Sequence, residues 1–219
     1  LLKLIRPGDI SYSSTENSTY EVKYPNYFSH EGKEYTINTK LIGNHFISNI
    51  TGAIALAKKN GISIEQSLNS IENFVGVKRR TEFIGKFNGV NFYDDYGHHP
   101  TEIKATTKAL KENTVGNLIV IFQPHRFTRT RDHFDDLKNS FNYSDLTLIT
   151  DIYSAGEKPI PGISSLLFEG EGIKYIKSPR MVPHYVKTNI KPGDTVLTIG
   201  AGDITLLGPQ ILKYLNENK

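Results

Sequence analysis

The stretch Asn117-Leu-Ile-Val-Ile-Phe122-Gln-Pro-His-Arg-Phe-Thr-Arg129 decides the fold, because an apolar run passes into polar loop residues and then into a helix predicted over residues 128–141. A short apolar run of this kind predicts a buried β-strand. The same rhythm continues on both sides, with further strands predicted at 81–87, 90–94, 146–150, 173–176 and 195–199, and further helices at 100–112, 162–168, 179–188 and 206–214. Such alternation predicts an α/β fold with a mostly parallel sheet covered by helices on both faces.

The first eighty residues follow a different pattern. Apolar or aromatic side chains two positions apart predict short strands at 10–12, 20–24 and 35–37. Apolar residues three and four apart then predict a helix over 46–57, and Ser63 with Gln66 predicts a capping box at the start of a second helix over 63–74. A boundary near residues 76–81 therefore separates the end of one domain from a complete α/β domain.

Composition narrows the class of protein. The chain has 219 residues, no Cys, a formal net charge of +3 and 37% hydrophobic residues. The absence of Cys excludes a thiolate nucleophile and any Cys-ligated metal site, and no apolar run approaches the roughly 18 residues of a membrane span. These features predict a cytoplasmic globular protein that binds neither nucleic acid nor membrane. Because the chain opens on Leu1 and passes directly into strand-like sequence, we expect it to be the later part of a longer polypeptide.

Polar residues follow four of the predicted strands. The four segments are Asp94–Pro100, Gln123–Arg129, Asp151–Glu157 and Gly200–Asp203. In a parallel α/β sheet, ligands bind beyond the carboxyl ends of the strands. We therefore expect the four loops to converge on one pocket.

Two of these loops admit alternative interpretations. The adjacent pair His98-His99 could hold a metal, as in a metal hydrolase, or could simply enter a helix; adjacent histidines project differently, and no third ligand lies at helical spacing. His125, Arg126 and Arg129 could form a solvated face balanced by the Asp residues at 132, 135 and 136. The helix dipole disfavours cations at a helix start, however, so an anionic ligand bound by the Arg side chains explains them better.

Two further signals are weak when taken alone. Gly200-Ala-Gly-Asp203 resembles a phosphate-binding turn but is too short for a dinucleotide-binding fingerprint. Arg79-Arg80, at the domain junction, is the kind of pair that ordinarily lies on a surface.

Four blocks taken together resemble the ATP-dependent Mur peptide ligases of bacterial peptidoglycan synthesis, and among them the UDP-N-acetylmuramate–L-alanine ligases. The blocks span residues 94–103, 122–130, 151–160 and 200–204, and their order and spacing agree with that family. The resemblance covers residues 40–219 well and residues 1–40 only by position. It implies that residues 80–219 form the family's C-terminal Rossmann-like domain and that residues 1–79 are the end of its central ATP-binding domain.

The resemblance also implies roles for individual residues. Asn49 matches the second Asn of a block that contacts adenine, and Phe46 stands where the first Asn would be. Arg80 matches the arginine that reaches the nucleotide phosphates, and Asp95 matches the Asp that approaches the ribose. The residues that match the amino-acid and product site are Tyr96, His98, His125, Arg126 and Arg129. The family's Gly-Lys-Thr phosphate loop and its magnesium ligands belong to earlier sequence that this chain lacks.

The reaction implied by the resemblance is ATP-dependent amide formation. Phosphate passes from ATP to the lactyl carboxylate of UDP-N-acetylmuramate, and the amine of L-alanine attacks the acyl phosphate, with Arg80 and His98 as the catalytic residues in this part of the enzyme. ATP and Mg²⁺ are then the cofactors, and the missing N-terminal and central domains are the partners, so the chain alone is expected to be inactive. Two alternatives stay open: the related ligase that reattaches recycled tripeptide, and a non-catalytic nucleotide- or anion-binding module.

Overall fold

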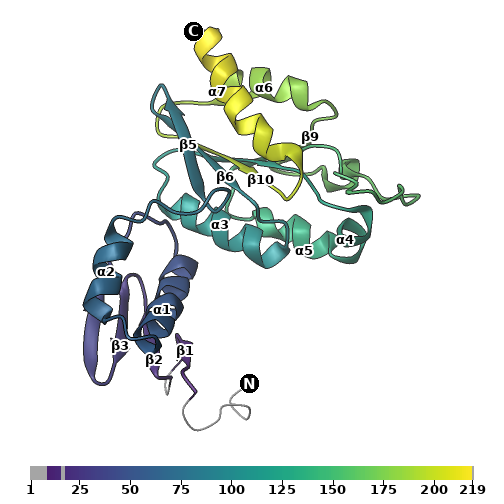
Figure 1. Cartoon of the computed structure of the whole chain (residues 1–219). Helices are drawn as coiled ribbons and strands as arrows, with labels where there is room; N and C mark the ends of the chain where they lie inside the picture. The colour runs from purple at the N-terminus through teal and green to yellow at the C-terminus, as the bar shows by residue number, and fades with distance from the viewer. Residues whose placement is uncertain (1–8, 16–17, 219) are drawn as a thin grey trace. The chain divides into compact units, whose positions relative to one another are not determined.

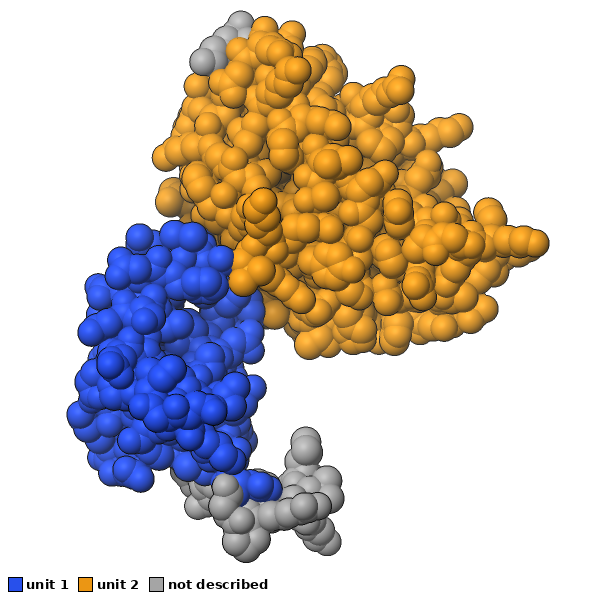
Figure 2. Space-filling view, viewed as in Figure 1, with its two compact units in different colours: residues 1–76 blue, residues 77–219 orange. Residues whose placement is uncertain are grey.

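The structure, a computed structural model (Figure 1), describes residues 9–15 and 18–218. The chain divides into two compact units, residues 1–76 and 77–219, which Figure 2 distinguishes by colour. Each unit has its own hydrophobic core, and each is described by itself. The division falls inside the predicted boundary region, while the assignment of residues 1–79 to a central ATP-binding domain stays a prediction.

The first unit packs two helices against a small sheet. Strand β1 is parallel to β2, and β2, β3 and β4 follow one another in antiparallel order. The strands are β1 (Tyr12–Ser13), β2 (Tyr20–Lys23), β3 (Tyr27–His30) and β4 (Lys33–Thr36), and the helices are α1 (Asn44–Lys59) and α2 (Ile64–Glu72). Strand β3 lies in a stretch where the sequence predicted none; it pairs with both neighbours and buries Phe28 completely.

The helices of this unit follow from their sequence. Helix α1 buries Ile47, Ile50 and Ile54, which recur three and four residues apart along one face. Helix α2 begins with the predicted capping box, in which the Ser63 hydroxyl accepts from the N–H of Gln66 and the Gln66 side chain accepts from the N–H of Ser63, both at 3.1 Å. The sheet contributes its own buried side chains to this core, Tyr20, Val22 and Phe28.

The second unit contains a six-stranded sheet in the order β5-β6-β10-β7-β8-β9. Every neighbouring pair is parallel except β5 with β6, so the predicted mostly parallel α/β sheet is confirmed. The strands are β5 (Glu82–Phe87), β6 (Val90–Asp95), β7 (Leu118–Phe122), β8 (Leu146–Ile149), β9 (Ile173–Tyr175) and β10 (Thr195–Ile199). The last strand in the sequence, β10, lies between β6 and β7 and is buried along its whole length.

Helices cover both faces of this sheet, α3 and α5 on one face and α6 and α7 on the other (Figure 1). The helices are α3 (Pro100–Glu112), α4 (Phe127–Asp132), α5 (Phe134–Lys138), α6 (Val182–Asn189) and α7 (Leu207–Glu217). Short 3₁₀ turns accompany them: η2 (Asn139–Phe141), η3 (Ser165–Phe168), η4 (Pro179–Met181) and η5 (Asp203–Leu206). In the part of the chain that the structure describes, no helix has the length and apolar character needed to cross a membrane.

Two predicted helices of this unit differ from the observed structure. The helix predicted over 128–141 is interrupted at His133, whose φ of −122° and ψ of 24° are not helical. The interruption separates α4 from α5, where Phe134 packs against Phe168 with ring centroids 4.8 Å apart. The helix predicted over 162–168 is reduced to the turn η3, because Gly162 adopts a φ of +81° and Ser164 is extended.

Candidate functional site

The four polar loops lie at one edge of the second unit's sheet, beyond the carboxyl ends of the neighbouring strands β6, β10, β7 and β8. Side chains connect the loops. Gln123, after β7, donates from Nε2 to Asp203, after β10, at 2.7 Å. The rings of His98 and His125 lie 6.0 Å apart, and His125 stacks on Tyr153 at 5.5 Å. Residues from all four loops therefore form one candidate site.

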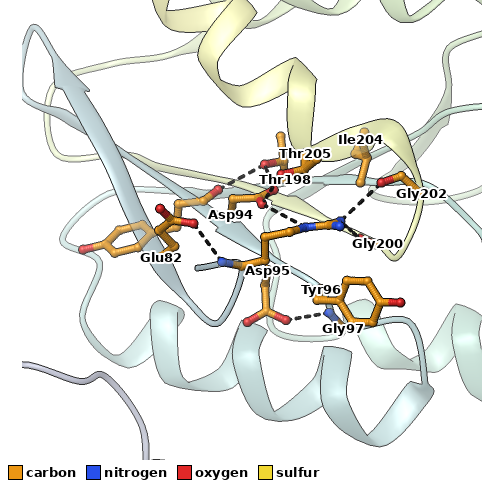
Figure 3. A network of polar contacts seen from close by, with 12 residues as sticks. Glu82, Asp94, Asp95, Tyr96, Gly97, Thr198, Gly200, Gly202, Ile204 and Thr205 are labelled. Atoms are coloured by element: carbon orange, nitrogen blue, oxygen red, sulfur yellow. Dashed lines mark hydrogen bonds and ion pairs between the residues drawn. The ribbon is translucent and has the colours of Figure 1, made fainter. Parts of the chain in front are cut away.

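Asp94, near the end of β6, is a buried anchor for this edge of the sheet. Its carboxylate is 1% exposed and accepts hydrogen bonds from the hydroxyls of Thr198 and Thr205, each at 2.7 Å (Figure 3). Nε of Arg79 lies 3.6 Å from the same carboxylate. A buried charge is tolerated only when it is paired and hydrogen-bonded. These contacts therefore stabilise Asp94 and hold β6, β10 and η5 together.

Asp95 follows on the other face of the strand and holds backbone groups. Its carboxylate accepts from the N–H of Thr81 and the N–H of Gly97, both at 2.7 Å, and from the Thr81 hydroxyl at 3.2 Å. Burial raises the pKa of the Asp95 carboxyl above its ordinary value, although these donors and the charge of Arg80 act to lower it. The structure thus gives Asp95 a role in shaping the loop, and its predicted approach to a ribose stays a prediction.

The adjacent histidines have different partners. Nδ1 of His98 lies 3.1 Å from the carbonyl oxygen of Tyr96; since a carbonyl only accepts, Nδ1 carries the proton and Nε2 of the neutral ring keeps its lone pair. His99 is the N-cap of α3, where its Nδ1 accepts from the N–H of Thr101 and Glu102 completes a capping box. The helix-entry interpretation therefore applies to His99, and the pair does not present two ligands to one metal.

His125 has the opposite tautomer. Nη1 of Arg129 lies 3.2 Å from Nδ1 of His125; because a guanidinium only donates, Nδ1 accepts and the ring proton is on Nε2. Partial burial lowers the pKa of His125 below its ordinary value of 6.5, and the charges of Arg129, His98 and Arg126 lower it further. At pH 7 His125 is therefore a neutral imidazole that donates from Nε2.

Arg126 begins the turn into α4 with a φ of +71°, which few residues other than glycine adopt. Its N–H donates to the carbonyl of Tyr153 at 2.8 Å, and its own carbonyl accepts from the N–H of Thr130 at 3.1 Å and from the Thr130 hydroxyl at 2.8 Å. Backbone strain of this kind persists where the surroundings fix it, and it is concentrated at functional sites. The loops after β7 and β8 thus hold the exposed Arg126 side chain at the site.

Arg126 and Arg129 form no close ion pair with an acidic side chain of the described residues, although the charge of Arg126 contributes, after the hydrogen bonds from Thr128, to the lowered pKa of Glu157. Within residues 9–15 and 18–218, no carboxylate oxygen lies within 4.0 Å of a guanidinium nitrogen of Arg126 or Arg129. Asp132, which the solvated-face interpretation assigned to this group, pairs with Arg131 at 2.7 Å instead. Guanidinium groups match the geometry of carboxylates and phosphates, so this donor set fits an anionic ligand.

Arg80 and Tyr96 stand at the other end of the candidate site. The Arg80 side chain is 49% exposed and lies 3.8 Å from Oε1 of Glu102. The Tyr96 ring is 37% exposed, with the guanidinium of Arg79 over it at 4.7 Å and that of Arg80 at 5.9 Å. His98 meets the same ring edge-on at 5.3 Å. Arg80 is therefore available to a ligand, whereas Arg79 is occupied.

Three residues of the site, Arg79, Asp94 and Tyr153, were not predicted from the sequence. The pairs at 79–80 and 94–95 are visible in the sequence, but the backbone conformation decides which member turns inward. Tyr153 lies in one of the four predicted polar loops, but only the stacking on His125 shows that its ring belongs to the site.

In the same loop Glu157 accepts from the hydroxyl and the N–H of Thr128 at 2.6 and 3.0 Å, which lowers the pKa of Glu157.

The remaining predicted residue, Asn49, lies in the first unit. It is exposed on α1, three residues after the partly buried Phe46. Its predicted contact with adenine stays a prediction.

Among the described residues, no group of three or more His, Asp or Glu side chains is arranged to hold a metal ion.

Comparison with known proteins identifies similar sequences. The family model described as "Mur ligase, glutamate ligase domain" matches residues 79–202. A UDP-N-acetylmuramate–L-alanine ligase of Koribacter versatilis (strain Ellin345) is 35% identical over 100% of this chain and 52% of its own length. The ligase of the same name from Pelotomaculum thermopropionicum is 38% identical over 100% of this chain and 45% of its own. The chain thus spans about half the length of these curated relatives.

Solved structures share the fold. The UDP-N-acetylmuramate-alanine ligase MurC from Thermotoga maritima superposes with a TM-score of 0.79 at 22% identity, covering 97% of this chain and 49% of that one. The MurF ligase from Thermotoga maritima, solved in complex with ADP, gives a TM-score of 0.74 at 16% identity, covering 95% and 49%. At these identities the likeness establishes the fold alone.

Proposed function

Because this chain belongs to the Mur ligase family, we propose that it is the C-terminal part of an ATP-dependent ligase that joins L-alanine to UDP-N-acetylmuramate. Two curated ligases named for these substrates align with the whole chain at 35% and 38% identity. The structural observation that carries the proposal is the pair Arg126 and Arg129, without carboxylate partners among the described residues, beside two histidines of opposite tautomer. Such a site suits an anionic substrate that must also lose a proton.

The proposed reaction has two steps. ATP supplies a phosphoryl group to the carboxylate of UDP-N-acetylmuramate, which gives an acyl phosphate and ADP. The amine of L-alanine then attacks the acyl carbon: a C–N bond forms, the C–O bond to phosphate breaks, and the amine gives up a proton. Every species along this path is anionic, so positioned cations supply most of the stabilisation.

Arg126 and Arg129 bind the carboxylate of the amino acid in this proposal. Arg129 is already held by its hydrogen bond to His125, so it loses less conformational freedom when it binds. The neutral His125 adds a donor at Nε2.

His98 is the proposed acceptor of the amine proton. Its Nε2 keeps a lone pair because Nδ1 donates to the carbonyl of Tyr96. Histidine is the side chain that most often transfers protons to and from reacting groups in enzymes. Glu102, with Oε2 3.8 Å from Nδ1, stabilises the imidazolium that forms.

The nucleotide part of the proposal rests on two exposed side chains, Arg80 and Asn49, and on the buried Asp95. Arg80, whose side chain is 49% exposed and lies 3.8 Å from Glu102, binds the phosphates, and Asn49 and Asp95 bind adenine and ribose. The magnesium ligands and the phosphate loop are placed in the N-terminal and central domains that precede this chain. We propose that the reaction takes place in the cytoplasm.

The test compares the full-length ligase with the isolated chain. Phosphate release is measured with ATP, Mg²⁺, UDP-N-acetylmuramate and L-alanine, and in parallel with the recycled tripeptide in place of L-alanine. We expect the full-length ligase to turn over L-alanine at a rate in the ordinary range of roughly 1–1000 per second, and the isolated chain to be inactive. Turnover of the tripeptide but not of L-alanine would identify the recycling ligase instead, and nucleotide binding without turnover would leave only a binding module.

A further inference from the structure

The turn that carries Arg80 is strained on both sides. Arg79 has a φ of +58° and Thr81 a φ of +47°. Positive φ is uncommon for any residue but glycine, and for a β-branched residue such as Thr it is a genuine outlier. Two such residues flank Arg80 within three positions, so the surrounding structure must hold the turn in place.

Carboxylates hold both strained residues by their backbone N–H groups. The N–H of Arg79 donates to Glu82 at 2.8 Å, and the N–H of Thr81 donates to Asp95 at 2.7 Å. The carbonyl of Arg79 accepts from the N–H of Tyr96 at 2.7 Å. The turn is therefore attached to the beginning of β5, to the end of β6 and to the loop that follows β6.

The side chain of Arg79 extends these attachments to β10. Its Nη2 donates to the carbonyl of Gly200 at 2.6 Å and lies 3.3 Å from that of Gly202, two oxygens of the loop after β10. Its Nε lies 3.6 Å from Asp94, the anchor shown in Figure 3. The guanidinium also covers the Tyr96 ring at 4.7 Å. One side chain thus connects the turn, the loop after β6 and the loop after β10.

Arg80 has the opposite environment. Its side chain is half exposed and lies 3.8 Å from Oε1 of Glu102. Its backbone, however, is confined between two residues that are each fixed by a carboxylate. A mobile side chain on a fixed backbone reaches a ligand at a lower entropy cost than one on a mobile loop.

We propose that Arg79 is a positioning residue, which holds the strained turn against the loop after β10 and thereby places Arg80 and Tyr96 at the site. This inference rests on the proposed function of Arg80 as a phosphate ligand. Lys cannot replace Arg79, because an ammonium reproduces neither the planar fork that meets two carbonyls nor the stacking on Tyr96. The expected defect of Arg79→Lys is therefore a loss of placement rather than a loss of charge.

The first experiment measures amide hydrogen exchange in the chain itself and does not depend on activity. In Arg79→Lys the N–H groups of Thr81 and Tyr96 should exchange about tenfold faster, as expected for the loss of a local contact network, while Val120 in β7 keeps its protection. Lys78→Met, which removes the neighbouring cation, is the matched control and should leave all three amides unchanged. Asp94→Asn weakens the same attachment with little change of shape and should act as Arg79→Lys does. Unchanged exchange at Thr81 and Tyr96 in both variants would overturn the proposal.

The second experiment is a double-mutant cycle in the full-length ligase, read as kcat/KM for ATP. Arg79→Lys should cost about tenfold in the wild-type background and less than about twofold in an Arg80→Ala background, because residues that act through one another are not additive. Equal costs in the two backgrounds would reduce Arg79 to a general stabiliser and overturn the proposal. Wild-type kinetics in Arg80→Ala alone would overturn the phosphate role of Arg80, while the exchange measurement still decides whether Arg79 holds the turn.

Discussion

Arg129, in α4, donates a hydrogen bond at 3.2 Å to Nδ1 of His125, which lies four residues earlier, just before the helix. The bond fixes the imidazole proton on Nε2 and places a permanent positive charge beside the ring. A ring in these surroundings resists protonation. His125 is therefore a hydrogen-bond donor at neutral pH, and in the proposed reaction it leaves the amine proton to His98.

This relationship predicts the titration of His125. The pKa of the ring should lie below 6.5, and Arg129→Met should raise it more than Arg126→Met does, because Arg129 contributes the larger of the two charge effects. The stabilisation from a neutral His125 is complete above the ordinary value of 6.5 and is lost as the pH falls through the lowered pKa. Histidine ring signals followed by NMR between pH 4 and 9 measure the shift. A midpoint at or above the ordinary value in the unsubstituted chain would contradict this account.

A methyl group at Gly202 should disturb the site by crowding. A Cβ there would collide with Oε1 of Gln123 and would lie 2.7 Å from Cγ of Tyr153. We expect Gly202→Ala to cost about 1–3 kcal/mol in unfolding free energy and to shift the ring signals of His125, which stacks on Tyr153. Gly170→Ala is the control, since nothing lies closer than 3.8 Å to its added Cβ. Thermal unfolding of the two variants should separate them clearly; equal melting temperatures would count against the packing described for the loop after β10.

The two adjacent histidines should give opposite phenotypes. His99→Ala removes the N-cap of α3 and should cost about 0.5–2 kcal/mol in stability with little effect on ligation. His98→Ala removes the proposed proton acceptor and should depress amide formation far more than the melting temperature. Rates and melting curves of both variants of the full-length ligase test this pair. Wild-type ligation by His98→Ala, or a deficit fully explained by its unfolding, would deny His98 a chemical role.

Lysine replacements should distinguish carboxylate binding from a solvated face. Arg126→Lys and Arg129→Lys keep the charge but lose the planar fork, so each should cost roughly 1.5–3 kcal/mol in kcat/KM for L-alanine, the size of one charge-assisted contact. Arg131→Lys is the control, because Arg131 pairs with the exposed Asp132. Steady-state kinetics with varied L-alanine decide the matter, and unchanged kinetics in both test variants would restore the solvated-face interpretation.

The sequence predicted the elements whose signals are local. The apolar run of β7 and the Ser63–Gln66 capping box can each be identified from a few consecutive residues. The position of the polar loops at one edge follows from the parallel order of the strands. The helix predictions that were wrong depend on contacts between segments that are distant in the sequence. The interruption at His133 accompanies the packing of Phe134 on Phe168.

The same limit applies to the site. The side chains of neighbouring residues in one motif point in different directions, because the backbone conformation sets them. Arg79 contacts the carbonyl of Gly200, whereas Arg80 is half exposed. The positive φ of Arg79 cannot be predicted from its residue type. His98 and His99 differ likewise, since only one of them caps α3. Residue identity thus indicates which chemistry is present, and the fold decides which of two adjacent residues performs it.

Strand β10 enters the sheet between β6 and β7, pairing with both along residues 195–199. During synthesis these two strands leave the ribosome long before the strand that separates them. Until residues 195–199 arrive, each has an edge with unpaired N–H and C=O groups, the surface on which strands of other chains add. Truncation of the chain before residue 195 would therefore remove the middle of the sheet rather than its margin, and the truncated product should aggregate instead of folding as a shortened domain.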